Sequence, residues 1–433
     1  MSLPTAVEPR HIPVAIVGAG QAGLSLSWHL SRAGIEHVLL ERSGVAHEWS
    51  AGRWDNFTLV TPNWQCRLPG YEYSAGDPDG FMKRDDVYNF VREYSDSFGA
   101  PVEEGVDVTR LVPAAEGGYV LSTSHGPVTA DQVVVATGGY HNPIIPSYAA
   151  GIPAAVTQIH SSEYRSPAAL AAGGVLVVGS GQSGAQIAED LFLEGRDVHL
   201  ALGTAPRVAR FYRGRDCVAW LHDMGIYNIP VQQQAGGLSK RESTNHYVTG
   251  RDGGRDIDLR AFARDGMHLY GRLTGLDTGR LTFAPTVAAS LDYADSVAES
   301  IKNNIDEYIA RSGIDAPTEP RYSPVWTPPV EPDALDLVAA GISTIIWSIG
   351  YSADYRWINV GVFDGAGHPT HHRGVTDSDG LYFLGLPWLN TWGSGRFEAI
   401  ARDAEYLANH IIARTDAAGR GDARQDRRVE LAS

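Results

Sequence analysis

The 433-residue sequence has only two cysteines, Cys66 and Cys217, and they lie far apart. Two thiols are too few for a disulfide framework or a cysteine-rich metal site. No Cys-x-x-Cys pair is present, which argues against the dithiol chemistry of a disulfide reductase. Three histidines, at positions 368, 371 and 372, have no carboxylate or cysteine at convincing ligand spacing, so the sequence predicts no metal site.

Basic residues and long apolar runs are also scarce. The 35 lysines and arginines face 51 acidic residues, and the net charge of −16 argues against a nucleic-acid partner. No apolar run approaches the roughly 20 residues of a membrane-spanning helix. The segment from Met1 to Arg10 lacks the charged start and apolar core of a signal peptide. We therefore expect a cytoplasmic protein with no membrane partner.

A glycine-rich segment near the N-terminus is the strongest signal that is present. The apolar residues 14–17 lead into Gly18-x-Gly20-x-x-Gly23, a helical pattern follows to Gly34, and a second apolar stretch ends at Glu41. Dinucleotide binding typically uses this order of elements: a strand, a tight turn, a helix, a second strand and an acidic residue. The helix N-terminus can bind a pyrophosphate, and the acid can bind ribose hydroxyls. The candidate contacts of this first unit are Gly18, Gly20, Gln21, Ala22, Gly23, Glu41, Arg42, Trp49 and Gly138.

The same pattern occurs a second time, beginning at Gly179, and its helix ends at Gly195 after the same interval. Leu202 occupies the place of the acid, and Arg207, Arg210 and Arg213 follow it. Since a carboxylate would repel a 2′-phosphate and guanidinium groups bind one, the first unit is predicted to hold FAD and the second NADPH. For any single arginine, a solvated basic face is the alternative. The candidate contacts of this second unit are Gly179, Gly181, Gln182, Ser183, Gly184, Thr204, Arg207 and Arg210.

Two similar strand ends suggest how the two units are connected. An apolar strand runs into residues 136–140, and another runs into residues 348–351; each ends in a small residue and glycine. We interpret them as the points where the chain leaves and re-enters the first domain. The prediction is an α/β fold with two Rossmann-like domains, the NADPH domain being inserted in the FAD domain. The predicted bounds are 1–150 and 341–412 for the FAD domain, 151–340 for the insert, and 413–433 for a polar, disordered tail.

Residues 44–100 are rich in aromatic side chains, including Trp49, Trp54 and Trp64. Such a segment suits a wall over a flat heteroaromatic ring, although for each single tryptophan core packing is the alternative.

Two glycine-rich units without a cysteine pair resemble the class B flavin monooxygenases, which include the flavin-containing, YUCCA and Baeyer–Villiger enzymes. Between the units, His160 and Tyr164 match the family motif Phe-x-Gly-x-x-x-His-x-x-x-(Tyr/Phe/Trp), whereas Ala154 and Val156 replace its Phe and Gly. The region of Trp49 resembles the family's flavin segment without its glycines, and segments 136–138 and 348–351 resemble its hinges. More closely, the chain to about residue 412 resembles a bacterial branch of flavin-dependent oxidoreductases whose genes often lie beside a nitrilase-type gene.

The resemblance implies a mechanism. NADPH would reduce FAD, O₂ would form a C4a-(hydro)peroxyflavin, and a small-molecule substrate would be oxygenated at a nitrogen or sulfur atom. Asn63 is the candidate for assisting the peroxide, although it is displaced from the family's asparagine, and Arg53 is a second catalytic candidate. Trp49 and residues 392–394 are further candidates for the flavin environment.

Three alternatives stay open. Baeyer–Villiger oxygenation is less favoured because Tyr164-Arg165 stands where that subgroup prefers Trp-Pro. The second alternative is an NADPH oxidase or dehydrogenase that transfers no oxygen. The third is a nucleotide-sensing partner protein that turns over slowly. The oligomeric state is also left open, with a homodimer among the possible states.

Overall fold

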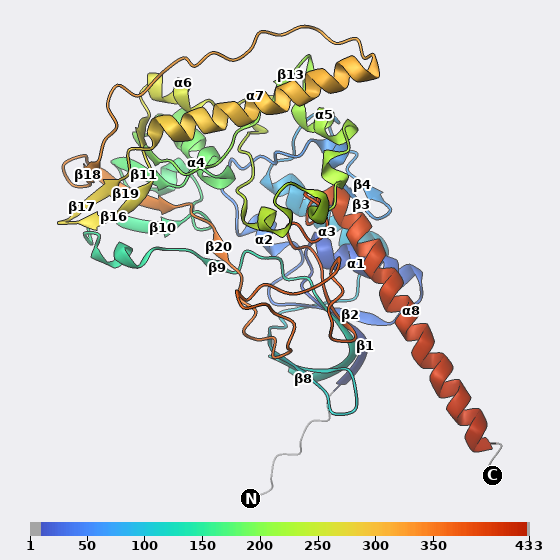
Figure 1. The fold of residues 1–433 in the computed structure, drawn as a ribbon. Helices are drawn as coiled ribbons and strands as arrows, with labels where there is room; N and C mark the ends of the chain where they lie inside the picture. Colours follow the sequence, from blue (N-terminus) through green and yellow to red (C-terminus); the bar gives the residue numbers. More distant parts are fainter. Residues whose placement is uncertain (1–9, 431–433) are drawn as a thin grey trace, which may run out of the picture.

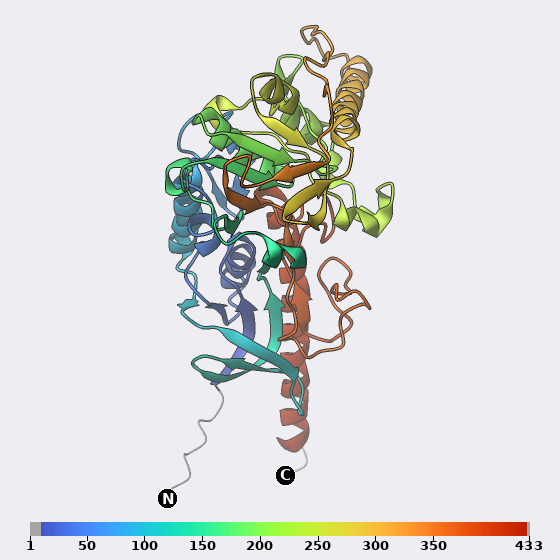
Figure 2. The same ribbon diagram turned by 90° about the vertical axis from the view of Figure 1, so that its left-hand side faces the viewer.

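The computed structural model describes residues 10–430, with side chains described to residue 418. The chain forms two large β-sheets, each with helices beside it, at opposite ends of the molecule (Figures 1 and 2). The predicted α/β fold with two Rossmann-like units is confirmed. None of the helices described in residues 10–430 combines the length and the apolar character needed to cross a bilayer.

The first sheet contains the first glycine-rich turn. Strand β1 is parallel to both of its neighbours, β2 and β8. Strand β8 also pairs antiparallel with β7, and these two strands form the meander expected at residues 118–135. A last strand, β21, returns from the end of the chain to pair parallel with β8. The strand order is β5 (Val102–Glu104), β2 (His37–Glu41), β1 (Arg10–Val17), β8 (Gly126–Val135), β7 (Tyr119–Thr123) and β6 (Val108–Pro113), with β21 (Leu381–Phe383) beside β8.

The second sheet contains the second turn, and every strand pair in it is parallel. Its order is β10 (Thr157–His160), β19 (Ile342–Trp347), β11 (Gly174–Val178), β12 (Val198–Ala201) and β15 (His268–Tyr270). A small antiparallel sheet lies beside it, formed by β16 (Leu273–Asp277), β17 (Arg280–Phe283) and β18 (Ala334–Asp336). The smaller strand pairs are β3 (Arg67–Leu68) with β4 (Tyr71–Glu72), and β13 (Phe211–Tyr212) with β14 (Arg215–Asp216).

Helices complete each unit. The longer helices are α1 (Gln21–Arg32), α3 (Arg84–Phe98), α4 (Gln182–Leu193), α7 (Val287–Ser312) and α8 (Phe397–Glu430). The short ones are α2 (His47–Ser50), α5 (Cys217–Asp223) and α6 (Leu259–Arg264), with 3-10 turns at 63–65, 147–151, 167–169, 226–228, 231–233, 237–242 and 251–253. Helix α1 packs against α8 and buries Leu24, Leu26 and Leu30 completely.

The predicted end of the inserted segment needs correction. Strand β19, at residues 342–347, pairs with β11 in the second sheet, so this sheet extends beyond residue 340. The chain crosses between the sheets where β9 (Asn142–Pro143) pairs antiparallel with β20 (Tyr351–Ser352). The apolar strand before Gly350 therefore belongs to the insert and not to the returning segment. Strand propensity alone could not show which sheet would accept it.

The predicted disordered tail is also corrected within the described range. Helix α8 continues to Glu430, far beyond Thr415 (Figure 1). The segment is rich in alanine and arginine, which favour helix, and it extends a helix already nucleated by packing against α1. Residues 431–433 of the predicted tail lie outside the described residues.

Candidate functional site

The first glycine-rich turn packs tightly against the protein backbone at its first and third glycines and leaves free space at its middle glycine. Gly18 has φ +107°, and a Cβ atom there would lie 2.7 Å from the carbonyl oxygen of Ala136. A Cβ atom at Gly23 would lie 2.1 Å from the carbonyl oxygen of Gly18. At Gly20, by contrast, a Cβ would meet no atom within 4 Å. The first and third glycines are therefore required by the fold, and the middle one leaves space for a ligand.

The N-terminus of α1 faces that open space. Gly20 is its N-cap, no side chain caps the helix, and its first turn has no acidic residue, so backbone N–H groups are available to an anion. Glu41, at the end of β2, accepts hydrogen bonds from the backbone N–H groups of Ala19 (2.8 Å) and Ser43 (2.9 Å). These bonds fix the Glu41 carboxylate at the edge of the cavity, beside Arg42.

The second turn repeats this geometry. Gly179 has φ +103°, and a Cβ there would lie 2.5 Å from the carbonyl oxygen of Ser348. A Cβ at Gly184 would lie 1.9 Å from the carbonyl oxygen of Gly179, whereas one at Gly181 would meet only Thr244 Cγ2, at 3.5 Å. Gly181 caps α4 without a side-chain hydrogen bond. The residues present at both turns thus fit a dinucleotide pyrophosphate.

Both turns open into one cavity of about 1570 Å³. A site for one small molecule is usually about 300–1,000 Å³, so this cavity has room for more than one ligand. Sequence-predicted residues in its lining are Gly18, Gly20, Gln21, Ala22, Glu41, Arg42, Trp49, Arg53, Gly138, Gly179, Gly181, Gln182, Ser183 and Thr204. Gly23 and Gly184 are not among the lining residues, in agreement with their packing against the turns.

Trp49 and Arg53 form an aromatic and cationic wall of the cavity. The Trp49 indole N–H donates to Gln21 Oε1 at 3.1 Å, and its ring stacks on Phe397 with centroids 5.7 Å apart. The Arg53 guanidinium lies over the Trp49 ring, 5.2 Å from its centroid, and over Phe57. Trp49 and Arg53, both from the aromatic segment that the sequence predicts as a wall over a flat ring, line this cavity.

A second wall comes from segments that the sequence did not identify in this combination. The rings of Tyr227 and Trp392 stack with centroids 4.9 Å apart, and Trp388 stacks on Trp392 at 6.4 Å. Arg396 lies over the Trp392 ring at 4.9 Å and donates to Asn245 Oδ1 at 3.2 Å. Burial lowers the pKa of the Arg396 guanidinium. Among the described residues, no carboxylate lies within ion-pair distance of it, so this wall presents an unneutralised cation to the cavity.

Arg207 and Arg210 do not reach the cavity, and their predicted contact with a 2′-phosphate is corrected. Arg207 is buried and donates to Asp295 at 2.6 Å, and Arg210 is buried and donates to Asp216 Oδ1 at 2.6 Å. Each guanidinium is therefore engaged by a carboxylate of the protein. The sequence could not show this because the Arg207 partner is 88 residues away.

Asn63 is likewise corrected as a catalytic candidate. Its side chain is buried, and Nδ2 donates to the backbone carbonyl of Asp77 at 2.8 Å. Its backbone N–H donates to Gly80. Asn63 thus holds the loop of residues 77–80, while its neighbours Thr61 and Gln65 line the cavity.

His160 and Tyr164, the two matched positions of the family motif, lie at the crossing between the sheets. Both are fully buried. A His160 ring nitrogen lies 3.1 Å from the carbonyl oxygen of Gly350, and the Tyr164 hydroxyl donates to Asp190 Oδ2 at 2.6 Å. The motif therefore ties residues 160–164 to the returning strand and to α4.

The two cysteines are both buried, and they are not paired with each other. Burial raises the pKa of both thiols well above the ordinary value, which suppresses the reactive thiolate. Neither side chain lines the cavity. Neither cysteine therefore places a reactive thiol at the cavity.

Comparisons with known proteins agree with this geometry. Residues 15–221 match the family model described as pyridine nucleotide-disulphide oxidoreductase. A Geobacillus kaustophilus protein described as an uncharacterized oxidoreductase CzcO-like is 29% identical over 406 residues, which cover 93% of this chain and 98% of the relative. The rice indole-3-pyruvate monooxygenase YUCCA4 is 32% identical over 193 residues, 41% of this chain and 44% of the relative.

The fold is also found in a flavin-containing monooxygenase from Stenotrophomonas maltophilia. The TM-score is 0.64 at 17% identity, and the match covers 94% of this chain and 99% of that one. These matches support the family resemblance seen in the sequence: the chain is similar to flavin-dependent oxidoreductases related to the class B monooxygenases.

Proposed function

We propose that the protein is an FAD- and NADPH-dependent monooxygenase that oxygenates a small molecule at nitrogen or sulfur in the cytoplasm, with O₂ as second substrate. The observation that carries the proposal is the opening of two dinucleotide-type turns into one cavity of about 1570 Å³. One nucleotide must deliver a hydride to the other, and a shared cavity brings both reactive rings within reach. The two sheets would then act as FAD and NADPH domains.

FAD fits the first turn. Gly20 and the N-terminal N–H groups of α1 would hold its pyrophosphate, and Glu41 would accept hydrogen bonds from its ribose. Trp49 and Arg53 would then lie beside the flavin ring. Bound FAD supplies hydride acceptance and O₂ activation. The chain's own residues would bind and orient the ring.

NADPH fits the second turn, with Arg272 in place of Arg207 and Arg210 as the cation for its 2′-phosphate. Strand β15 lies next to β12, and the N–H of Leu202 donates to the carbonyl of Tyr270. Arg272 follows two residues after Tyr270, is exposed, and lines the cavity near Leu202 and Thr204. A guanidinium at this strand end is suited to a phosphate on the adenosine ribose.

The second wall indicates which substrates to try first. Trp388, Trp392 and Tyr227 offer flat apolar surface, and the Arg396 cation has no carboxylate partner among the described residues. A flat molecule that carries a negative charge would satisfy both features. We therefore expect amines, oximes and thioethers with a carboxylate to be better substrates than their neutral analogues.

The test measures stoichiometry. Purified holoenzyme is incubated with NADPH, O₂ and a candidate thioether or amine, and NADPH loss, oxygenated product and hydrogen peroxide are quantified together. The proposal predicts incorporation of ¹⁸O from ¹⁸O₂ into product, with peroxide falling as product rises. An NADPH oxidase would give one peroxide per NADPH with every compound in the panel, and that result would contradict the proposal.

A further inference from the structure

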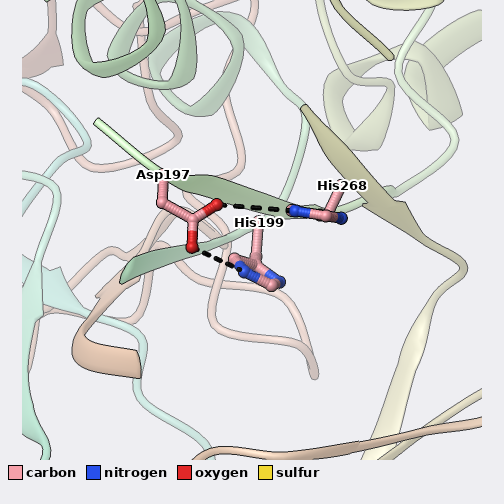
Figure 3. A group of neighbouring side chains, drawn as sticks. All are labelled: Asp197, His199 and His268. Carbon is pink, nitrogen blue, oxygen red and sulfur yellow. Dashed lines mark ion pairs between the residues drawn. The ribbon is translucent and has the colours of Figure 1, made fainter. Parts of the chain in front are cut away.

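Three possible metal ligands meet at the opposite end of the second sheet from the glycine-rich turn. His199 on β12 and His268 on β15 are direct cross-strand partners, so both side chains occupy the same face. Asp197 precedes His199 by two residues and directs one carboxylate oxygen toward each ring (Figure 3). Among the described residues, this is the only group of three such ligands that lie close together.

The distances suit a metal ion better than direct hydrogen bonding. Asp197 Oδ2 lies 3.5 Å from His199 Nε2, and Asp197 Oδ1 lies 3.5 Å from His268 Nε2. An N–H···O hydrogen bond normally spans about 2.7–3.2 Å. Around a tetrahedral Zn²⁺ with bonds of about 2.0–2.1 Å, neighbouring donor atoms are about 3.3–3.4 Å apart. All candidate donor atoms here lie within 4.8 Å of one another.

His199 has the features of a prepared ligand. It is buried, and its Nδ1 lies 2.8 Å from the Tyr270 hydroxyl, an outer contact that orients the ring. Its other nitrogen, Nε2, faces Asp197.

Asp197 and His268 leave the group accessible from solvent. The exposed fractions of their side chains are 52% and 55%, against 6% for His199. The rings of His199 and His268 stack with centroids 4.4 Å apart and an interplanar angle of 24°. A rotation of the exposed His268 ring would turn its Nε2 lone pair toward an ion beside Asp197, and water could take the fourth position.

We propose that Asp197, His199 and His268 bind a divalent transition-metal ion, with Zn²⁺ as the best match to two imidazoles and one carboxylate. None of the three lines the central cavity. The ion would clamp β12 to β15, the strands whose other ends carry Leu202 and Arg272. It would thus be a structural site, independent of the oxygenation chemistry.

The sequence prediction of no metal site missed this group for a physical reason. Ligand spacing reveals only histidines that are close in sequence, whereas His199 and His268 are 69 positions apart and are brought together by strand pairing.

The test uses full-length holoenzyme treated with a chelator and then titrated with ZnCl₂ in a calorimeter. We expect one Zn²⁺ per chain and a rise in melting temperature. His268→Ala and Asp197→Asn should each weaken binding by more than about tenfold, since even loss of a side chain that only hydrogen-bonds to a metal ligand costs that much. Without metal, these two variants should have the same melting temperature as the parent protein, which would show that they fold.

The matched control is His368→Ala, which removes an exposed histidine 3.7 Å from Asp364 at a place where no third ligand completes a site among the described residues. Its Zn²⁺ binding should equal that of the parent protein. Co²⁺ should also give the visible absorption of a tetrahedral site, and His268→Ala should abolish it. Absence of stoichiometric binding in the parent protein, or equal binding by the parent protein and both variants, would overturn the proposal.

Discussion

Gly23 and Gly18 are packed so closely that a Cβ on Gly23 would lie 2.1 Å from the Gly18 carbonyl oxygen. Three residues before Gly23, a Cβ on Gly20 would meet nothing within 4 Å. The three glycines of one motif therefore have two different physical functions. Two allow the protein backbone to pack on itself, and one leaves room for the ligand.

This difference predicts contrasting effects of two alanine substitutions. Gly23→Ala must push α1 away from its turn, so it should lower the melting temperature even of the flavin-free protein. Gly20→Ala should leave that temperature almost unchanged and weaken FAD binding, because its methyl group occupies the space of the pyrophosphate. Flavin content and apoprotein melting curves measure both effects. Similar loss of apoprotein stability in the two variants would contradict this account.

Arg272 is expected to determine the preference for NADPH over NADH. Arg272→Ala should raise the Michaelis constant for NADPH by about tenfold or more and leave that for NADH nearly unchanged, because only NADPH carries the 2′-phosphate. Arg280→Ala, an exposed arginine on β17 that does not line the cavity, is the control and should change neither constant. Equal increases for both nucleotides in Arg272→Ala would rule out this function.

The buried pair of Arg210 and Asp216 should contribute to stability and not to nucleotide choice. Arg210→Met leaves the Asp216 carboxylate buried without its guanidinium partner, which should lower the free energy of unfolding by about 3–5 kcal/mol. Urea unfolding of the parent protein and the variant measures this change. At temperatures where the variant is folded, the ratio of kcat/KM for NADPH to kcat/KM for NADH should equal that of the parent protein. A selective loss of kcat/KM for NADPH would instead indicate that Arg210 contacts the 2′-phosphate.

The lowered pKa values of two histidines should make the folded protein less stable in mild acid. Burial, followed by the charge of Arg396, lowers the pKa of His246 to about 4; burial and Arg241 lower that of His371 to about 4. Between pH 4 and the ordinary value of 6.5, the unfolded state binds more protons than the folded state, so stability falls as the pH falls through this window. Each unit of pKa difference corresponds to about 1.4 kcal/mol.

Melting temperatures from pH 7 to 4 test this expectation. His246→Gln and His371→Gln should each make the decline shallower, since glutamine does not titrate. His125→Gln, an exposed histidine in the turn before β8, should leave the decline unchanged. A decline equally steep in all three variants would assign the acid sensitivity to other groups.

Much of the fold could be predicted because its signals are local. The glycine spacing, the apolar strands and the helical pattern between them specify both dinucleotide-type turns within about 25 residues each. The end of the insert at β19 could not be placed in the same way. It depends on whether residues 342–347 pair with β11 or with a strand of the first sheet, which is a choice between distant partners.

For the candidate site, too, only the residues within local motifs could be predicted from the sequence. Residues within the motifs, such as Gly20 and Glu41, line the cavity. Arg210 follows its motif closely in sequence and yet turns into a buried ion pair, whereas Arg272 lies far from the motif and reaches the cavity through the pairing of β12 with β15. Side-chain direction at the ends of strands depends on long-range packing, which sequence spacing does not record.

Anaerobic mixing of the FAD-loaded enzyme with NADPH in a stopped-flow spectrometer tests most directly whether NADPH at the second turn can reduce FAD at the first. If the two turns hold the two nucleotides around one cavity, the oxidised-flavin absorbance should bleach in a single saturable phase, and much higher NADH concentrations should be needed for the same rate. Retention of bound FAD without any bleaching by NADPH would contradict the account, because it would mean that the two sites do not bring their ligands together.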